Sequence, residues 1–289
     1  MIALALAIGV PDRHPAGVDA QFTDSNFLTS DGVRLHFLQA GKGDEVRPVI
    51  VFVPGWSMPA SIWKKPMELL AADFRVVALD PRGQGGSQIP GDGYTLERRA
   101  QDIAEFVARY PGAVLVSWSL GALESLEYVY VHGTGSLSGL VIVDSSVGEG
   151  ATPAVPPGGS AGGFQVELRK DRVAALDGFV RAIFRTPQSE ADLAALREGA
   201  LRIPLEASLS LLPGNRIPRE HWRAIVRAFD KPLLYLVTSQ FAAQAADLKA
   251  SRSSTQVEVF ETAGHALFVD EPERFSRRLA AFVATLHPD

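Results

Sequence analysis

Short apolar runs recur along the chain, and segments with helical spacing separate most of them. Continuous apolar runs occupy residues 48–54, 74–80, 113–117, 139–144, 232–238 and 256–260. Runs of this length without alternation are typical of strands buried on both faces of a parallel sheet. Residues 32–41 alternate between apolar and polar positions instead, which predicts a half-exposed strand.

Helical spacing occupies the intervals between the runs. Apolar residues recur every three or four positions over 95–110, 120–132 and 272–286. The last of these segments opens on Pro272, and proline is favoured at the first position of a helix. Because strands and helices alternate, the sequence predicts an α/β fold whose sheet is mostly parallel.

This alternation stops after the run at 139–144. Residues 148–163 are rich in Gly, Pro and Ser, which continue neither a helix nor a strand. From 164 to about 228 the spacing is helical, with no strand-like run. We therefore expect three parts: an N-terminal arm at 1–25, a core formed by 26–148 and 229–289, and a helical cap at 149–228.

Composition narrows the possible functions. The chain has 289 residues, of which 46% are hydrophobic, a formal net charge of -5 and no cysteine. This size suits one large domain, or a domain with an inserted piece. The absence of a basic stripe argues against nucleic acid as a partner, and the absence of cysteine excludes disulfides and thiolate chemistry.

The N-terminal stretch is apolar from Ile2 to Val10, which is too short to span a bilayer. It resembles a short secretory signal with a small-residue cleavage site at Ala20, although no Lys or Arg precedes the apolar run. We expect a cytoplasmic protein without an integral membrane segment, with export as the alternative.

The stretch VLVSWSLGAL, at 114–123, places a candidate nucleophile between a strand and a helix. A sharp strand-to-helix turn exposes a serine, and it needs small residues two positions before and after that serine. Centring on Ser119 puts Ser117 and Gly121 at those positions, whereas centring on Ser117 would put Leu115 at one of them. Ser119 is therefore the candidate nucleophile, and Ser117 is expected to be a packing residue.

Three further motifs make the chain resemble the α/β-hydrolase superfamily from about residue 30 to the end. VIVFVPGW resembles the third strand and its following loop, with Pro54 in place of the usual histidine. VVALDPRGQGGS resembles the Asp-x-Arg-Gly-x-Gly-x-Ser loop, and AGHALFVDEPERF resembles the final segment with its Gly-His pair. The resemblance is strongest to the lidded lipase, esterase and dehalogenase-like branch. It implies a mostly parallel eight-stranded sheet flanked by helices, with a helical cap after strand six.

The resemblance also implies further site residues. His265, in the Gly-His pair, is the implied base. The implied oxyanion hole consists of the backbone N–H groups of Trp56 and Leu120. Because these donors belong to the backbone, the departure at Pro54 leaves the hole intact.

The acid of the triad is where the sequence departs from the superfamily. Members commonly carry an Asp just beyond the strand at 232–238, but here no carboxylate follows until Asp247, in a helical pattern. Asp144, at the end of a strand, resembles the relocated acid of haloalkane dehalogenases and some lipases. The alternative is that Ser119 and His265 act as a dyad without an acid. Asp144 would then only cap its own loop. Asp270 is expected to cap the last helix.

These residues predict a serine hydrolase that cleaves a carboxylic ester or lactone through an acyl-enzyme on Ser119. The prediction requires neither cofactor nor metal. Carbon–carbon bond hydrolysis and cofactor-free perhydrolysis on the same triad remain alternatives, as does a non-catalytic binding protein. The expected partner is a small, largely apolar ester-like molecule, because apolar positions with scattered arginines make up the cap. No oligomeric state is indicated.

Overall fold

One eight-stranded sheet organises the part of the chain that the computed structural model describes, residues 20–43, 47–150, 161–212 and 218–286. The strand order is β1-β2-β4-β3-β5-β6-β7-β8. β2 runs antiparallel to β1 and β4, and the strands from β3 to β8 are parallel. The strands are β1 (Thr23–Leu28), β2 (Arg34–Ala40), β3 (Ile50–Val53), β4 (Val76–Leu79), β5 (Ala113–Trp118), β6 (Leu137–Val143), β7 (Leu233–Thr238) and β8 (Gln256–Phe260). The predicted mostly parallel sheet is confirmed.

In the part of the chain that the structure describes, no helix separates β1, β2 and β3; from β3 onward helices alternate with the strands, and five of them follow one another between β6 and β7. The helices are α1 (Lys64–Leu70), α2 (Leu96–Val107), α3 (Leu120–His132), α4 (Ala161–Lys170), α5 (Arg172–Ala182), α6 (Glu190–Arg202), α7 (Leu205–Leu211), α8 (Arg219–Ala228), α9 (Ala242–Ser251), α10 (Leu267–Asp270) and α11 (Pro272–Ala284), with short 3-10 turns at Ala60–Trp63 and Ser239–Phe241. No helix in the described ranges is both long and apolar enough to cross a membrane. The predicted arm up to residue 19, with its signal-like run, and the linker residues 151–160 lie outside the described residues.

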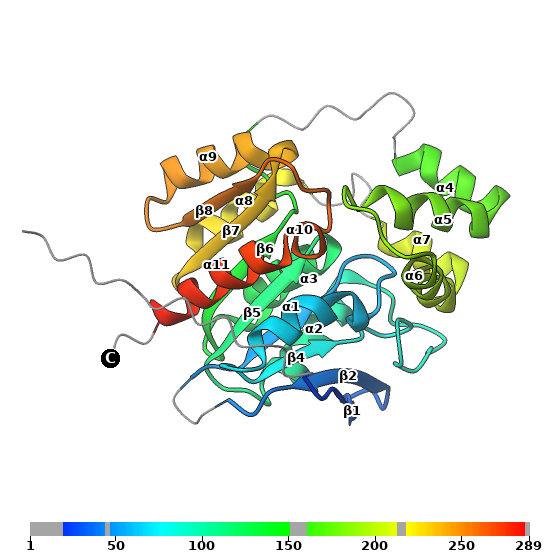
Figure 1. Ribbon diagram of the computed structural model, residues 1–289, viewed down its shortest axis with the longest axis horizontal. Helices are drawn as coiled ribbons and strands as arrows, with labels where there is room; N and C mark the ends of the chain where they lie inside the picture. The colour runs from blue at the N-terminus through cyan, green and yellow to red at the C-terminus, as the bar shows by residue number, and fades with distance from the viewer. Residues whose placement is uncertain (1–19, 44–46, 151–160, 213–217, 287–289) are drawn as a thin grey trace, which may run out of the picture.

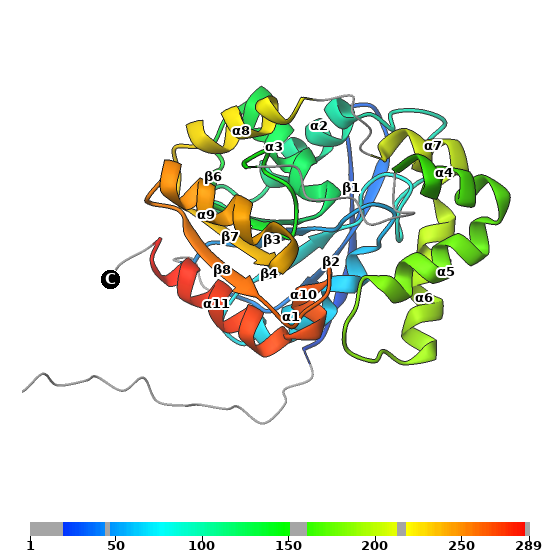
Figure 2. The same cartoon turned by 90° about the horizontal axis from the view of Figure 1, so that it is seen from above.

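Helices cover both faces of the sheet (Figures 1 and 2). α1, α10 and α11 pack on one face, and α2, α3, α8 and α9 pack on the other. Successive strand residues alternate between the two apolar clusters: Ile50 and Phe52 join the first, whereas Val51 and Val53 join the second. Because both faces are buried, the inner strands are apolar at nearly every position, with Ser117, Ser138 and Thr238 as the polar exceptions. This is why they appear as continuous apolar runs in the sequence.

The helices α4 to α7 lie together at one end of the molecule, at the right of Figure 1. Their buried apolar side chains join the cluster that contains Trp56 and Phe268. α8 differs, although the sequence placed it in the cap: Trp222, Ile225 and Val226 join the other cluster, where α8 packs against α3. The expected boundary at residue 228 stays a prediction, but by its packing α8 belongs with α3 on the core rather than with α4 to α7.

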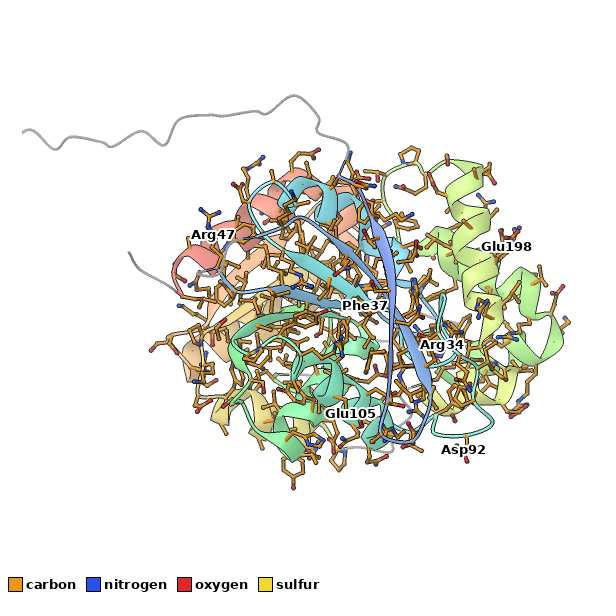
Figure 3. The ribbon with its side chains drawn as sticks, turned by 90° about the horizontal axis from the view of Figure 1, so that it is seen from below. Arg34, Phe37, Arg47, Asp92, Glu105 and Glu198 are labelled. Atoms are coloured by element: carbon orange, nitrogen blue, oxygen red, sulfur yellow. The ribbon has the colours of Figure 1, made fainter. Side chains whose placement is uncertain are left out.

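The antiparallel β1–β2 hairpin is fastened to α2 (Figure 3). The Glu105 carboxylate accepts hydrogen bonds from the Ser30 backbone N–H at 2.7 Å and from the Ser30 hydroxyl at 2.6 Å. The Phe37 ring packs on Phe106, with ring centroids 5.1 Å apart. These contacts attach the hairpin at the edge of the sheet to α2.

His36, on β2, lies between two carboxylates. Its Nδ1 is 2.7 Å from Asp80 Oδ2 and its Nε2 is 2.9 Å from Asp24 Oδ1. The hydrogen bond to Asp80 is the main cause that raises the pKa of His36 above its ordinary value of 6.5. Protonated His36 therefore stabilises the fold fully below about pH 6.5, and this stabilisation is lost as the pH rises through the raised pKa.

We expect His36→Gln to reduce the fall in melting temperature between about pH 6 and pH 8. His132→Gln, at the exposed end of α3, is the matched control and should leave the wild-type pH dependence unchanged. Thermal melts in a pH series measure both. Parallel curves for the wild type and His36→Gln would contradict the assignment.

Candidate active site

Ser119 lies in the turn between β5 and α3, with φ 54° and ψ -122°. A positive φ is uncommon for a non-glycine residue, and such strain clusters at functional sites. Within the described ranges the other two non-glycine residues with positive φ are Ser57 and Asp144, both in loops that border Ser119. A Cβ at Gly121 would lie 2.5 Å from the Pro54 carbonyl oxygen, so α3 and the loop after β3 approach closely only because this residue is glycine.

The predicted distinction between the two serines agrees with their contacts. Ser117 is buried, and its Oγ is 2.6 Å from Ser125 Oγ inside the core. The hydroxyl of Ser119 instead faces His265, with 2.9 Å between Ser119 Oγ and His265 Nε2. The Ser117 hydroxyl is therefore enclosed in the core, whereas the Ser119 hydroxyl contacts His265.

The sheet brings Ser119, Asp144 and His265 together. Trp118 and Val143 are paired across β5 and β6, so the next residue of each strand, Ser119 and Asp144, emerges at the same edge. His265 comes from the loop after β8, and its Nδ1 is 2.7 Å from Asp144 Oδ2. The three side chains form one chain of hydrogen bonds from hydroxyl to imidazole to carboxylate.

Asp144 is buried, with 1% of its surface exposed, and both of its oxygens are used. Oδ1 accepts hydrogen bonds from the Thr238 backbone N–H at 2.7 Å and from the Thr238 hydroxyl at 2.8 Å. Oδ2 remains for His265. Tyr235 fixes the following residue by donating its hydroxyl to the Ser145 carbonyl at 2.6 Å, and burial raises the pKa of that phenol. The Asp144 carboxylate is thus oriented by Thr238, at the end of β7, rather than by the backbone of its own loop.

The backbone N–H groups of Trp56 and Leu120 donate to no other group among the described residues. Gln84 fixes the loop that carries Trp56, because its Nε2 donates to the Met58 carbonyl at 2.6 Å and to the Gly55 carbonyl at 3.2 Å. Buried Arg99 orients that amide by donating to Gln84 Oε1 at 2.8 Å. One of these donors lies on a loop held by Gln84 and the other at the start of α3, and fixed N–H donors of this kind can stabilise a developing oxyanion.

The side chain of Trp56 reaches into the inserted helices. Its Nε1 donates to the Ser208 carbonyl on α7 at 2.7 Å. Its ring makes edge contacts with Phe164 on α4 and Phe179 on α5, at centroid distances of 5.6 and 5.3 Å. One residue therefore joins the loop after β3 to three helices of the insertion, and the wall that it builds is aromatic.

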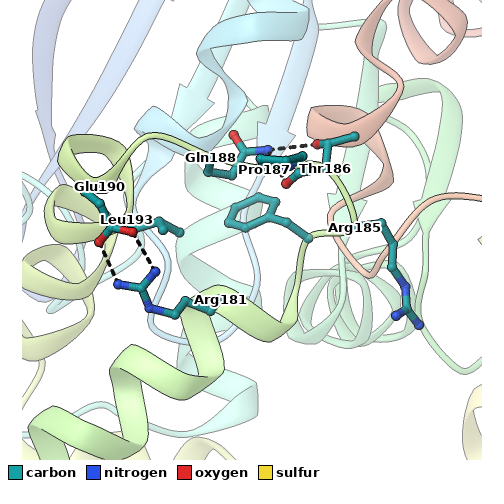
Figure 4. A pocket seen from close by; sticks show the side chains of 8 residues that line it. Arg181, Arg185, Thr186, Pro187, Gln188, Glu190 and Leu193 are labelled. Atoms are coloured by element: carbon teal, nitrogen blue, oxygen red, sulfur yellow. Dashed lines mark hydrogen bonds and ion pairs between the residues drawn. The ribbon is translucent and has the colours of Figure 1, made fainter.

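A depression of about 380 Å³ lies at the end of α5, the α5–α6 loop and the start of α6 (Figure 4). Its lining comes from Arg181, Phe184, Arg185, Thr186, Pro187, Gln188, Glu190 and Leu193. Ser119, Asp144 and His265 are absent from that lining, so this depression is not the candidate active site. No cluster of His, Asp or Glu in the described parts of the chain could hold a metal ion.

Several residues that support the site escaped the sequence analysis. Gln84 lies inside a loop motif that the sequence already showed, and Thr238 ends a predicted strand at the edge where the site forms. Their positions were the sole indication in the sequence that they could support the site. The prediction for Asp270 is wrong: Glu271 precedes α11 and provides no side-chain cap, while Asp270 bonds to the loop between α5 and α6. Asp247 is exposed on α9, as its helical pattern suggested.

The sheet, with its hydrogen-bonded Ser, His and Asp at the carboxyl edge, defines an α/β-hydrolase. The alpha/beta hydrolase family model matches residues 50–278, and the chain belongs to this family. The predicted superfamily and the predicted α/β-hydrolase enzyme are confirmed at that level.

Relatives and solved structures agree with this assignment. A pimeloyl-[acyl-carrier protein] methyl ester esterase of Vibrio atlanticus is 28% identical over 269 residues, which cover 86% of this chain and 97% of that protein. An esterase of Exiguobacterium antarcticum superposes with a TM-score of 0.77 at 21% identity, covering 90% of this chain and 98% of the other. A bromoperoxidase of Bacillus anthracis superposes with a TM-score of 0.74 at 20% identity, covering 90% and 99%.

Proposed function

We propose that the protein is a serine hydrolase that cleaves carboxylic esters through an acyl-enzyme on Ser119. The observation that carries the proposal is the hydrogen-bonded sequence from Ser119 through His265 to Asp144, with distances of 2.9 and 2.7 Å. This order is the one that general-base activation of a serine needs. The esterases among the relatives support the same reaction class.

Each residue has a defined task in the two half-reactions. Ser119 Oγ attacks the carbonyl carbon while His265 Nε2 takes its proton, and Asp144 stabilises the resulting imidazolium. The Trp56 and Leu120 N–H groups donate to the oxyanion of the tetrahedral intermediate. The imidazolium then protonates the departing alcohol. Water, deprotonated by His265, attacks the acyl-enzyme and releases the acid and the free Ser119 hydroxyl.

The inserted helices are proposed to act as a cap that selects the substrate. Trp56, Phe164 and Phe179 form an aromatic wall beside the oxyanion loop. Such a wall favours a small ester with an apolar acyl or alcohol group. A lactone is compatible with the same chemistry, because its opening leaves a hydroxyacyl group on Ser119.

A substrate panel tests the proposal against its alternatives. Purified protein is assayed on short- and medium-chain p-nitrophenyl esters, on lactones, on a β-diketone, and on acetate with hydrogen peroxide. Fluorophosphonate labelling, located by mass spectrometry, shows whether Ser119 is activated. Ester turnover with labelling at Ser119 supports the proposal. Turnover of the diketone alone, peroxide chemistry alone, or no labelling would favour, respectively, a carbon–carbon hydrolase, a perhydrolase or a binding protein.

A further inference from the structure

Asp270, the last residue of α10, joins two loops that meet beside His265. Its carboxylate accepts a hydrogen bond from the Gly264 backbone N–H at 2.7 Å, one residue before His265. The same carboxylate accepts from the backbone N–H groups of Arg185 and Thr186, each at 2.9 Å, and from the Thr186 hydroxyl at 2.6 Å. Arg185 and Thr186 lie between α5 and α6, in the inserted helices. One side chain thus links the insertion to the loop that carries the proposed base.

The two loops also touch through their backbones. The Ala266 N–H donates to the Ile183 carbonyl at 2.8 Å, on the other side of His265. A Cβ at Gly264 would lie 2.7 Å from the same Ile183 oxygen, so any larger residue there would push the loops apart. The N–H group before His265 is therefore bonded to Asp270, which itself bonds to the α5–α6 loop, and the N–H group after His265 is bonded to the Ile183 carbonyl at the end of α5.

The α5–α6 loop also has internal hydrogen bonds of its own. Gln188 Nε2 donates to Thr186 Oγ1 at 2.9 Å and to the Thr186 carbonyl at 3.1 Å (Figure 4). Ser189 then caps α6 by accepting from the Asp192 backbone N–H at 3.1 Å. Arg185 points away from this group of side chains in Figure 4, so its backbone rather than its guanidinium makes the contact with Asp270.

We propose that Asp270 is a positioning residue for His265, through which turnover depends on the docking of the α5–α6 loop. This inference rests on the proposed serine hydrolase function. His265 must keep Nε2 at Ser119 and Nδ1 at Asp144 at the same time, so a small backbone shift lengthens one bond or both. Misplacement of a reacting group by about 1 Å can cost about 100-fold in rate. Substrate binding to the aromatic wall does not need this alignment.

The test compares Asp270→Asn with a matched control, Asp247→Asn, which changes an exposed carboxylate on α9. The asparagine keeps the size of the side chain, but its NH₂ group faces N–H donors that the carboxylate had satisfied. We expect the kcat of Asp270→Asn to fall by about 10- to 100-fold while KM changes by less than about threefold. The control should keep the wild-type kcat.

Active-site titration with a fluorophosphonate separates positioning from mere structural support. A structural role lowers the number of titratable sites and leaves kcat per site unchanged, which would overturn the proposal. A positioning role lowers kcat per titrated site. Thr186→Val removes the hydroxyl bond to Asp270 and the bond that this hydroxyl accepts from Gln188, but it keeps both backbone bonds to Asp270. It should give a smaller fall of the same kind, and it carries the test if Asp270→Asn does not fold. Wild-type kcat per site in both variants would also overturn the proposal. An active Ser119→Ala protein would instead overturn the hydrolase function itself.

Discussion

Ser119→Ala should lower kcat/KM for ester hydrolysis by roughly 10⁴- to 10⁶-fold, because the alanine has no oxygen to form the acyl-enzyme. The neighbouring hydroxyl of Ser117 cannot substitute, since it is buried and bonded to Ser125. Steady-state assays on the best ester of the panel, with fluorophosphonate labelling alongside, measure the effect.

Folding stability should change little in the same variant. Ser119 Oγ bonds to His265, so its loss should alter the free energy of unfolding by about 1 kcal/mol or less. Ser117→Ala is the matched control: it should keep most of the turnover while losing about 1 kcal/mol of stability, since it leaves the Ser125 hydroxyl unpaired. Substantial ester turnover by pure Ser119→Ala protein would refute the assignment of the nucleophile.

The sequence was most informative where one physical requirement allows few residue types. The central strands are nearly continuous apolar runs because helices cover both faces, so β3 to β7 could be predicted from the hydrophobic pattern of the chain. The turn at Ser119 excludes a side chain at Gly121, where a Cβ would meet the Pro54 carbonyl. Such steric requirements leave a readable pattern in the sequence.

Contacts between distant segments left no such pattern. The helical spacing of 219–228 predicts an apolar face for α8 but not its partner, which is α3 rather than the helices α4 to α7. Asp270 stands where a carboxylate could cap α11, and nothing local indicates that the backbone of Arg185 would occupy it instead. The role of Gln84 could not be predicted either, because its partners Gly55 and Met58 belong to another loop. Tertiary contacts, rather than local propensity, decide these roles.

Asp144→Asn should lower turnover by roughly 10²- to 10⁴-fold, because the surroundings of Asp144 determine how an amide would lie. Thr238 presents its backbone N–H to Oδ1 at 2.7 Å, and this donor cannot be reversed. The amide oxygen of the asparagine must therefore face Thr238, so its NH₂ group faces Nδ1 of His265. Nδ1 then has to accept, which places the imidazole proton on Nε2. In that tautomer Nε2 cannot take the proton from Ser119.

The comparison needs folded protein and a second variant at the same carboxylate. Thr238→Val removes the hydroxyl bond to Oδ1 but keeps the backbone N–H, so the tautomer is unchanged and turnover should fall by only about two- to tenfold. Asp247→Asn should keep full turnover, since that carboxylate is exposed on α9. Melting curves and fluorophosphonate titration normalise each rate to competent sites. If Asp144→Asn keeps nearly full turnover per site, Ser119 and His265 work as a dyad and Asp144 only ties β6 to β7. A loss in Thr238→Val as large as in Asp144→Asn would show that orientation of the carboxylate, rather than the tautomer of His265, limits the reaction.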